Sequence, residues 1–162
     1  MSRHATSALM SGLLGLIIGL SVTYWPSARL IISREQTPRA AIEVVNQATA
    51  LINKHGFDAF DLLDRDASFN RPDTYIFILA ADGTAVYHAA DRTQVGESFA
   101  NLRDIDQRPF GLRLITDAAP EGVWSSYRWQ NPATGQAEWK LTYTRQSRQG
   151  YIVGAGIYGG LE

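Results

Sequence analysis

The chain has 162 residues, of which 45% are apolar and 19% are charged, and its formal net charge is -1. This length suits one domain with a real core, and the near-neutral charge excludes the basic footprint that nucleic acid needs, so no nucleic-acid partner is expected. The absence of cysteine excludes disulfides, thiolate metal sites and thiol nucleophiles.

The N-terminus carries a membrane signal. Residues 9–22 read LMSGLLGLIIGLSV, and no charge separates Arg3 from Arg29. The stretch 8–28 is long enough for an uncleaved transmembrane anchor. A cleaved signal peptide is the alternative, although Pro26-Ser27-Ala28 makes a poor cleavage site. A buried helix of the globular domain fits less well, because glycine and serine interrupt the stretch and no polar face accompanies it.

We therefore expect residues 1–36 to form a signal or anchor with a short linker, and residues 37–162 to form one extracytoplasmic domain attached to the inner membrane or exported to the periplasm. The arginines that follow the apolar stretch leave the positive-inside rule indecisive. The outside location consequently depends on the signal-like N-terminus and on the family resemblance described below.

The first predicted elements of the domain are helical. Thr37-Pro38 supplies a hydroxyl N-cap followed by proline at the first helical position. Apolar residues then recur at helical spacing up to Ile52, and Gly56 is a suitable stop. A short second helix is expected over 57–63, followed by a polar loop over 64–73.

From Thr74 the pattern changes to strands. Residues 74–79 are rich in β-branched and aromatic side chains, and Asp82-Gly83 predicts a hairpin with a return strand over 84–88. After a long loop, Asp106 is expected to cap a helix that runs through Ile115. Three strands close the chain, over 123–129, 137–145 and 151–157. The order predicts an α+β domain with antiparallel pairing.

Two glycine motifs resemble catalytic signatures but lack the necessary context. Residues 154–159 match GxGxxG, yet no helix is predicted after them to hold a pyrophosphate. Residues 96–100 resemble a nucleophile elbow but lie in a predicted loop. The three histidines are not paired at metal-ligand spacing. We expect no cofactor, no metal and no enzymatic activity; a hydrolase is the less favoured alternative.

Strand alternation selects candidate ligand contacts. Glu138, Lys140, Thr142 and Thr144 share one face of the predicted strand 137–145. A lysine amid this polar stripe suits an anionic ligand group, although an ordinary solvated lysine is the alternative. Tyrosine and tryptophan suit pocket walls as well as core packing, and arginines in loops can close over a carboxylate. The candidate ligand-binding residues are Lys140, Tyr127, His88, Trp129, Tyr75, Phe77, Arg71 and Arg103.

Short motifs keep a consistent order between Tyr75 and Tyr158. They are YIFIL at 75–79, DGT at 82–84, His88, Gly96, GVW at 122–124, YRW at 127–129, NP at 131–132, Lys140, Tyr143 and GAGIY at 154–158. Together they resemble the single Cache domains of bacterial chemoreceptors and sensor kinases. Ala89 and Gln107 depart from this pattern, because the family often has proline and glycine there.

The resemblance implies a PAS-like antiparallel five-stranded sheet with a long N-terminal helix and a ligand pocket on one face. It also implies extracytoplasmic sensing of small organic acids, as in chemotaxis and signal transduction, with a lysine recurring at the position of Lys140. We expect a binding domain for a small molecule, above all a small carboxylate. A membrane-anchored interaction subunit without its own ligand is the alternative.

Receptors of this family continue into a second membrane helix and an output module, whereas this sequence ends four residues after Tyr158. We therefore expect either a stand-alone binding protein or a subunit that passes its occupancy to a membrane receptor or kinase partner. A homodimer through the N-terminal helix is a further expectation.

Overall fold

The computed structural model describes residues 37–71 and 74–159. The predicted signal or anchor within 1–36 lies outside these described residues. Within the described part of the chain, no helix combines the length and the apolar character needed to cross a membrane.

Helix α1 spans Pro38–His55 and begins and ends where the sequence predicts. Thr37 Oγ1 accepts a hydrogen bond of 3.1 Å from the backbone N–H of Ala40. Gly56 ends the helix with a φ of 60°, a backbone conformation that favours glycine. The second helix has the predicted length but begins and ends two residues later, since α2 covers Ala59–Arg65 and a 3-10 turn over Gly56–Asp58 precedes it.

Five strands form one antiparallel sheet in the order β2-β1-β5-β4-β3. The last strand of the chain therefore lies in the middle, between β1 and β4. The strands are β1 (Ile76–Leu79), β2 (Ala85–His88), β3 (Val123–Gln130), β4 (Ala137–Gln146) and β5 (Ile152–Tyr158).

The hairpin predicted at Asp82-Gly83 is confirmed. It joins β1 to β2, and the N–H of Gly83 donates to the carbonyl of Ala80 at 2.9 Å. The Asp82 carboxylate accepts from the N–H of Thr84 at 2.9 Å, and Gly83 has a φ of 86°. Both features stabilise a tight reversal of the chain.

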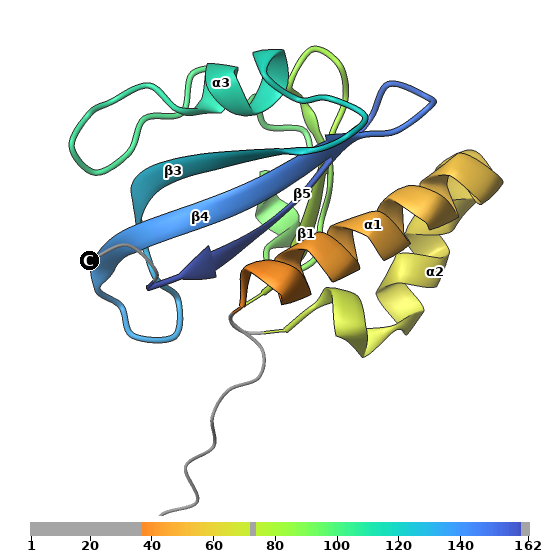
Figure 1. The fold of residues 1–162 in the computed structure, drawn as a ribbon, viewed down its shortest axis with the longest axis horizontal. Coiled ribbons are helices and arrows are strands. Elements are labelled where there is room, and N and C mark those ends of the chain that lie inside the picture. The colour runs from red at the N-terminus through yellow and green to blue at the C-terminus, as the bar shows by residue number, and fades with distance from the viewer. Residues whose placement is uncertain (1–36, 72–73, 160–162) are drawn as a thin grey trace, which may run out of the picture. The chain divides into compact units, whose positions relative to one another are not determined.

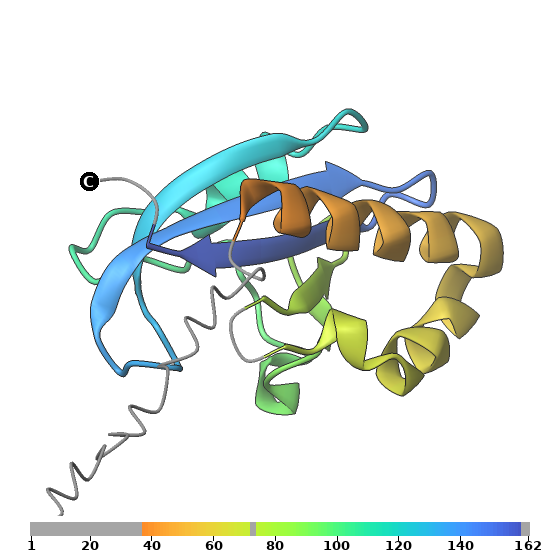
Figure 2. The same ribbon diagram turned by 60° about the horizontal axis from the view of Figure 1, so that its bottom comes forward.

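The sheet is covered on both faces (Figure 1). Helices α1 and α2 lie on one face, and Figure 2 shows α1 running along β5 and β4. The short helix α3 (Gly111–Thr116) and the long segment 89–110 cover the opposite face. We call these the α1 face and the α3 face. Each has its own cluster of buried apolar side chains.

The prediction that Asp106 caps a helix through Ile115 is wrong, because α3 begins only at Gly111. The buried carboxylate of Asp104 instead accepts the N–H groups of Asp106 and Arg108, each at 2.9 Å. These bonds close a turn at the position where the first helical turn was expected. Gln107, within this turn, has a φ of 64°, which is incompatible with an α-helix.

Candidate functional site

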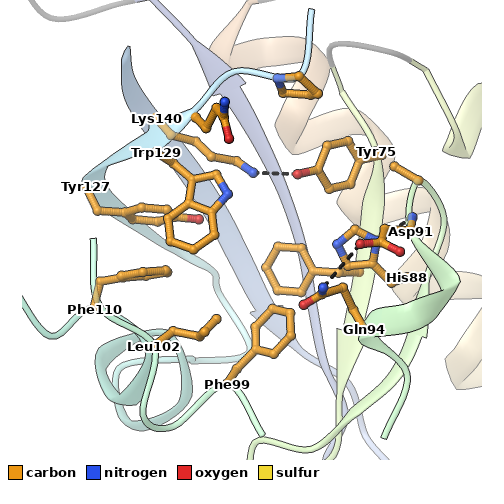
Figure 3. A pocket seen from close by; sticks show the side chains of 14 residues that line it. Tyr75, His88, Asp91, Gln94, Phe99, Leu102, Phe110, Tyr127, Trp129 and Lys140 are labelled. Atoms are coloured by element: carbon orange, nitrogen blue, oxygen red, sulfur yellow. Dashed lines mark hydrogen bonds between the residues drawn. The ribbon is translucent and has the colours of Figure 1, made fainter. Parts of the chain in front are cut away.

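A cavity of about 300 Å³ lies on the α3 face of the sheet. Strands contribute one part of its wall and the segment 89–110 contributes another (Figure 3). Six of the eight predicted candidates line it, namely Lys140, Tyr127, His88, Trp129, Tyr75 and Phe77. The topology therefore brings together residues that stand as much as 65 positions apart in the sequence.

Lys140 is the charged group at the centre of this site. Only 3% of the residue is exposed, so the solvated lysine that the sequence left open does not occur. Its ammonium donates a hydrogen bond of 2.9 Å to the Tyr75 hydroxyl, drawn as a dashed line in Figure 3. The same ammonium lies 4.7 Å from the ring centre of Tyr75 and 5.0 Å from that of Tyr158, where the electron-rich ring faces attract a cation.

The contacts of Lys140 favour its charged form, because the ammonium donates to the Tyr75 hydroxyl and lies over two aromatic rings. Burial lowers the pKa of Lys140, whereas the charges that Tyr127, Tyr75 and Tyr158 acquire once they ionise at high pH, together with the Tyr75 hydrogen bond, raise it. Burial also raises the pKa of Tyr127 and Tyr158, so these hydroxyls are neutral at physiological pH and are not counter-ions. No carboxylate of the described residues forms an ion pair with Lys140. A buried cation of this kind attracts an anion strongly.

His88 adds a neutral hydrogen-bond donor to the cavity. Its Nδ1 accepts the backbone N–H of Asp91 at 2.9 Å, which leaves the ring proton on Nε2. Burial and the charge of Lys140 lower the pKa of His88 to about 4, so the ring is uncharged at neutral pH. The Nε2–H has no hydrogen-bond partner among residues 37–71 and 74–159.

Aromatic rings form the apolar walls. The Tyr127 ring stacks on Phe110 at 3.8 Å between centres, and Trp129 meets Phe110 edge-on at 5.4 Å. Phe77 and Phe99 contact each other at 5.7 Å. In Figure 3 the Tyr127 and Trp129 group lies across the cavity from His88. The site thus combines one cation, the Asp91 carboxylate and a few polar hydrogens with a mostly apolar interior.

Two predicted candidates do not line this cavity. Arg71 lines a neighbouring hollow of about 290 Å³, which shares Ala90 and Pro132 with the cavity. Arg103 is exposed, and its guanidinium donates to the carbonyl of Gln107 at 2.9 Å. A role for either arginine in closing over a ligand stays a prediction.

The sequence reasoning missed the part of the wall that the segment 89–110 supplies. The overlooked lining residues include Phe99, Phe110, Leu102, Asp91 and Gln94. Loop residues have no strand alternation from which to assign a face, and Phe110 was placed in the incorrectly predicted helix. The signal available in the sequence was the occurrence of two phenylalanines in a predominantly polar segment, because large apolar side chains are most often buried.

The glycine motif at 154–159 belongs to β5 and the position after it, so Gly154 and Gly156 lie in a strand rather than in a phosphate-binding loop. The elbow-like residues 96–100 form a loop in which Ser98 bridges to Thr84, and Phe99 faces the cavity. In the part of the chain that the structure describes, no group of three or more His, Asp or Glu side chains could hold a metal ion.

Residues 34–160 match the family described as Single Cache domain 2. Over 87 residues the chain is 31% identical to the sensor histidine kinase MctS of Rhizobium johnstonii. That alignment covers 53% of this chain and 19% of the kinase, so the chain matches about a fifth of the length of this relative.

Three solved structures are similar in fold. A methyl-accepting chemotaxis protein from Vibrio parahaemolyticus has a TM-score of 0.59 at 18% identity, covering 74% of this chain and 86% of the other. A Cache chemosensory domain, studied for the structural basis of its carboxylic acid recognition, has a TM-score of 0.60 at 16% identity, covering 75% and 92%. A periplasmic sensor domain of a chemotaxis protein has a TM-score of 0.57 at 19% identity, covering 82% and 100%. At these identities the likeness shows a shared fold, the PAS-like sheet with a long N-terminal helix.

Proposed function

Because the chain belongs to the single Cache domain 2 family, whose members are extracytoplasmic, non-catalytic ligand-sensing domains of chemoreceptors and sensor kinases, we propose that it senses a small monocarboxylate. One observation carries this proposal. The ammonium of Lys140 is buried at an aromatic cavity, with a neutral tyrosine as its hydrogen-bond partner and no ion pair to a described carboxylate.

The cavity chemistry suggests how such a ligand binds. One carboxylate oxygen accepts from the Lys140 ammonium, and the Nε2–H of His88 supplies a second donor. Hydrogen bonds from an ionised donor to a carboxylate are stronger than neutral ones. The hydrocarbon part of the ligand then contacts Phe77, Phe110 and Trp129.

The same chemistry disfavours dicarboxylates. Among the described residues that line the cavity, Lys140 is the only cation, so a second carboxylate would have no positive partner in a cavity that aromatic rings and the Asp91 carboxylate line. Burying this second, unpaired carboxylate would cost roughly several kcal/mol of binding free energy. A cavity of about 300 Å³ is also at the small end for organic ligands, which favours a short acid.

We further propose that residues 1–36 hold this domain at the outer side of the inner membrane, supported by the apolar stretch at 9–22 and by the location typical of the family. Ligand occupancy would pass to a signalling module of the sensor kinase or chemoreceptor class, on the same polypeptide or on a membrane partner. The sequence relative named as a sensor histidine kinase supports this class of output.

A thermal-shift screen tests the ligand class. The purified chain is melted with acetate, propionate, butyrate and hexanoate, and with the primary amide and amine of the same lengths. Ligands that bind the native state raise the melting temperature by mass action. We expect shifts with the acids and none with the amides or amines.

Lysine variants locate the contact. Lys140→Met keeps a side chain of similar length without the charge. It is expected to raise the dissociation constant of the tightest-binding acid at least ~100-fold, since breaking a buried ion pair costs about 3–5 kcal/mol. Lys54→Met is the matched control, because Lys54 is exposed on α1. Absence of any shift from a chain shown to be folded would instead favour the interaction subunit without a ligand.

A further inference from the structure

Two glycines lie in the interior of the central strand, on the α3 face of the sheet. In β5, Val153, Ala155 and Ile157 belong to the apolar cluster of the α1 face, so Gly154 and Gly156 point the other way. Glycine inside a strand weakens the strand, and it often marks a place where another group approaches the backbone closely. Both glycines are in such a place.

Gly156 lies directly beneath the side chain of Lys140. A Cβ atom at position 156 would come within 2.3 Å of Lys140 Cε and 3.2 Å of Lys140 Cγ. It would also lie 2.9 Å from Thr142 Oγ1. Heavy atoms do not approach a real Cβ this closely, so any side chain at 156 displaces the lysine.

The path of the lysine explains this contact. Lys140 belongs to β4, whereas the hydroxyl that it contacts belongs to Tyr75, next to β1, and β5 separates these two strands. The side chain must therefore cross the central strand to reach its partner. Because Gly156 has no Cβ, the Lys140 side chain can lie flat on the backbone of β5 at this position.

Gly154 has the same relationship with an aromatic ring. A Cβ atom there would come within 2.2 Å of Phe77 Cζ and 2.7 Å of two further ring carbons. Phe77 lines the cavity, and the two residues are cross-strand partners between β1 and β5. The ring therefore lies down over the glycine, and a methyl group at 154 would push it into the cavity.

We infer that Gly156 is a positioning residue and that Gly154 is a specificity-determining residue of this site. Gly156 positions the Lys140 ammonium for the carboxylate, and Gly154 sets the room for the hydrocarbon tail by letting Phe77 lie flat. The inference deepens the proposed carboxylate site and rests on it for its binding consequences. Its geometric basis can be tested without any ligand.

Alanine at each position separates the two roles, and each variant is the control for the other. Gly156→Ala is expected to raise the dissociation constants of acetate, propionate, butyrate and hexanoate by a similar factor, at least tenfold. Gly154→Ala is expected to change the dissociation constant of acetate by no more than about twofold. The same variant is expected to raise the dissociation constant of hexanoate at least tenfold. Calorimetric titration of the full chain measures these ratios. Equal losses across all four acids in both variants, or no loss in either, would overturn the inference.

A double-mutant cycle tests the contact between position 156 and Lys140 without any ligand. Melting temperatures are compared for the starting chain, Gly156→Ala, Lys140→Ala and the double variant. If the added methyl group meets the lysine, Gly156→Ala lowers the melting temperature less once Lys140 is truncated, since contacting residues are non-additive. Strictly additive effects would overturn the positioning role of Gly156. A starting chain that binds none of the four acids would contradict the proposed function alone, and the cycle would still decide this inference.

Discussion

The two faces of the sheet show different ways of using the same strands. On the α1 face, Ile76, Ile78, Val153 and Ala155 are completely buried and close-packed beneath a helix. On the α3 face, neighbouring positions of these strands and of β4 hold glycines and threonines, together with aromatic rings and a lysine that line a cavity of about 300 Å³. Strand alternation allows this, because successive side chains point to opposite faces.

The difference separates stability from binding. Close apolar packing on the α1 face supplies the burial that stabilises the domain. The α3 face leaves room and holds polar groups out of water, which costs stability and creates a site for an anion. Substitutions on the two faces should therefore differ in what they change.

The largest expected loss of stability follows a substitution on the α1 face. Ile78→Ala removes a side chain that is 0% exposed and should lower the free energy of unfolding by about 3 kcal/mol. Leu102→Ala, on the cavity side, should cost less than half of this, because Leu102 is only partly buried and part of its surface already adjoins the cavity. Urea denaturation measures both. Equal losses would contradict the division between the faces.

The next effect appears in acid and comes from His88. Its pKa is lowered from 6.5 to about 4 by burial and by Lys140, so the folded state binds fewer protons than the unfolded state between these values. The free energy of unfolding should therefore fall as the pH drops from about 6.5 to 4, by about 3 kcal/mol in total, and should be unaffected above that window. His88→Gln should lose this dependence.

Urea denaturation at pH 7.5 and 4.5 gives the comparison for His88. Asp91 and Arg92 also act on this ring, so the variant is compared with His55→Gln, which removes an exposed histidine from the end of α1. The control should keep the acid sensitivity of the starting chain. A His88→Gln variant with unchanged acid sensitivity would show that His88 does not control this part of the profile.

A smaller effect is expected at Thr142 on the cavity side. Its Oγ1 forms a buried hydrogen bond of 2.9 Å with the Tyr127 hydroxyl. Thr142→Val leaves that hydroxyl without its partner and should destabilise the domain by about 1–2 kcal/mol. Thermal and urea denaturation check this value. An unchanged free energy of unfolding would mean that the Tyr127 hydroxyl finds another hydrogen-bond partner.

The smallest effect should have the opposite sign. Thr144 lies two residues further along β4 and is equally buried, but its Oγ1 has no hydrogen-bond partner among the described residues. Thr144→Val removes a buried polar atom and should raise the free energy of unfolding by about 0.5–1 kcal/mol. The two threonines are thus matched controls, and a loss of stability at Thr144 would indicate an ordered water bound to its hydroxyl.

Local sequence patterns predicted much of the fold. Thr37-Pro38 and Gly56 marked both ends of α1, and Asp82-Gly83 marked the first hairpin, because the conformation of each depends on only a few adjacent residues. The helix assigned to Asp106 failed for the corresponding reason. A competing carboxylate at Asp104 satisfies the same backbone N–H groups in a turn, and that competition depends on the buried position of Asp104.

Short-range sequence patterns predict the caps, the hairpin and the alternation that places Lys140 and Thr142 on the same side of β4, since these follow from backbone geometry over short distances. These patterns cannot determine that this polar side is buried, because burial depends on which segment folds back over the sheet. Only the tertiary structure brings Phe99 and Phe110 to the cavity and carries Lys140 across Gly156 to Tyr75. These contacts join distant parts of the chain, and their geometry arises from the packing of all five strands.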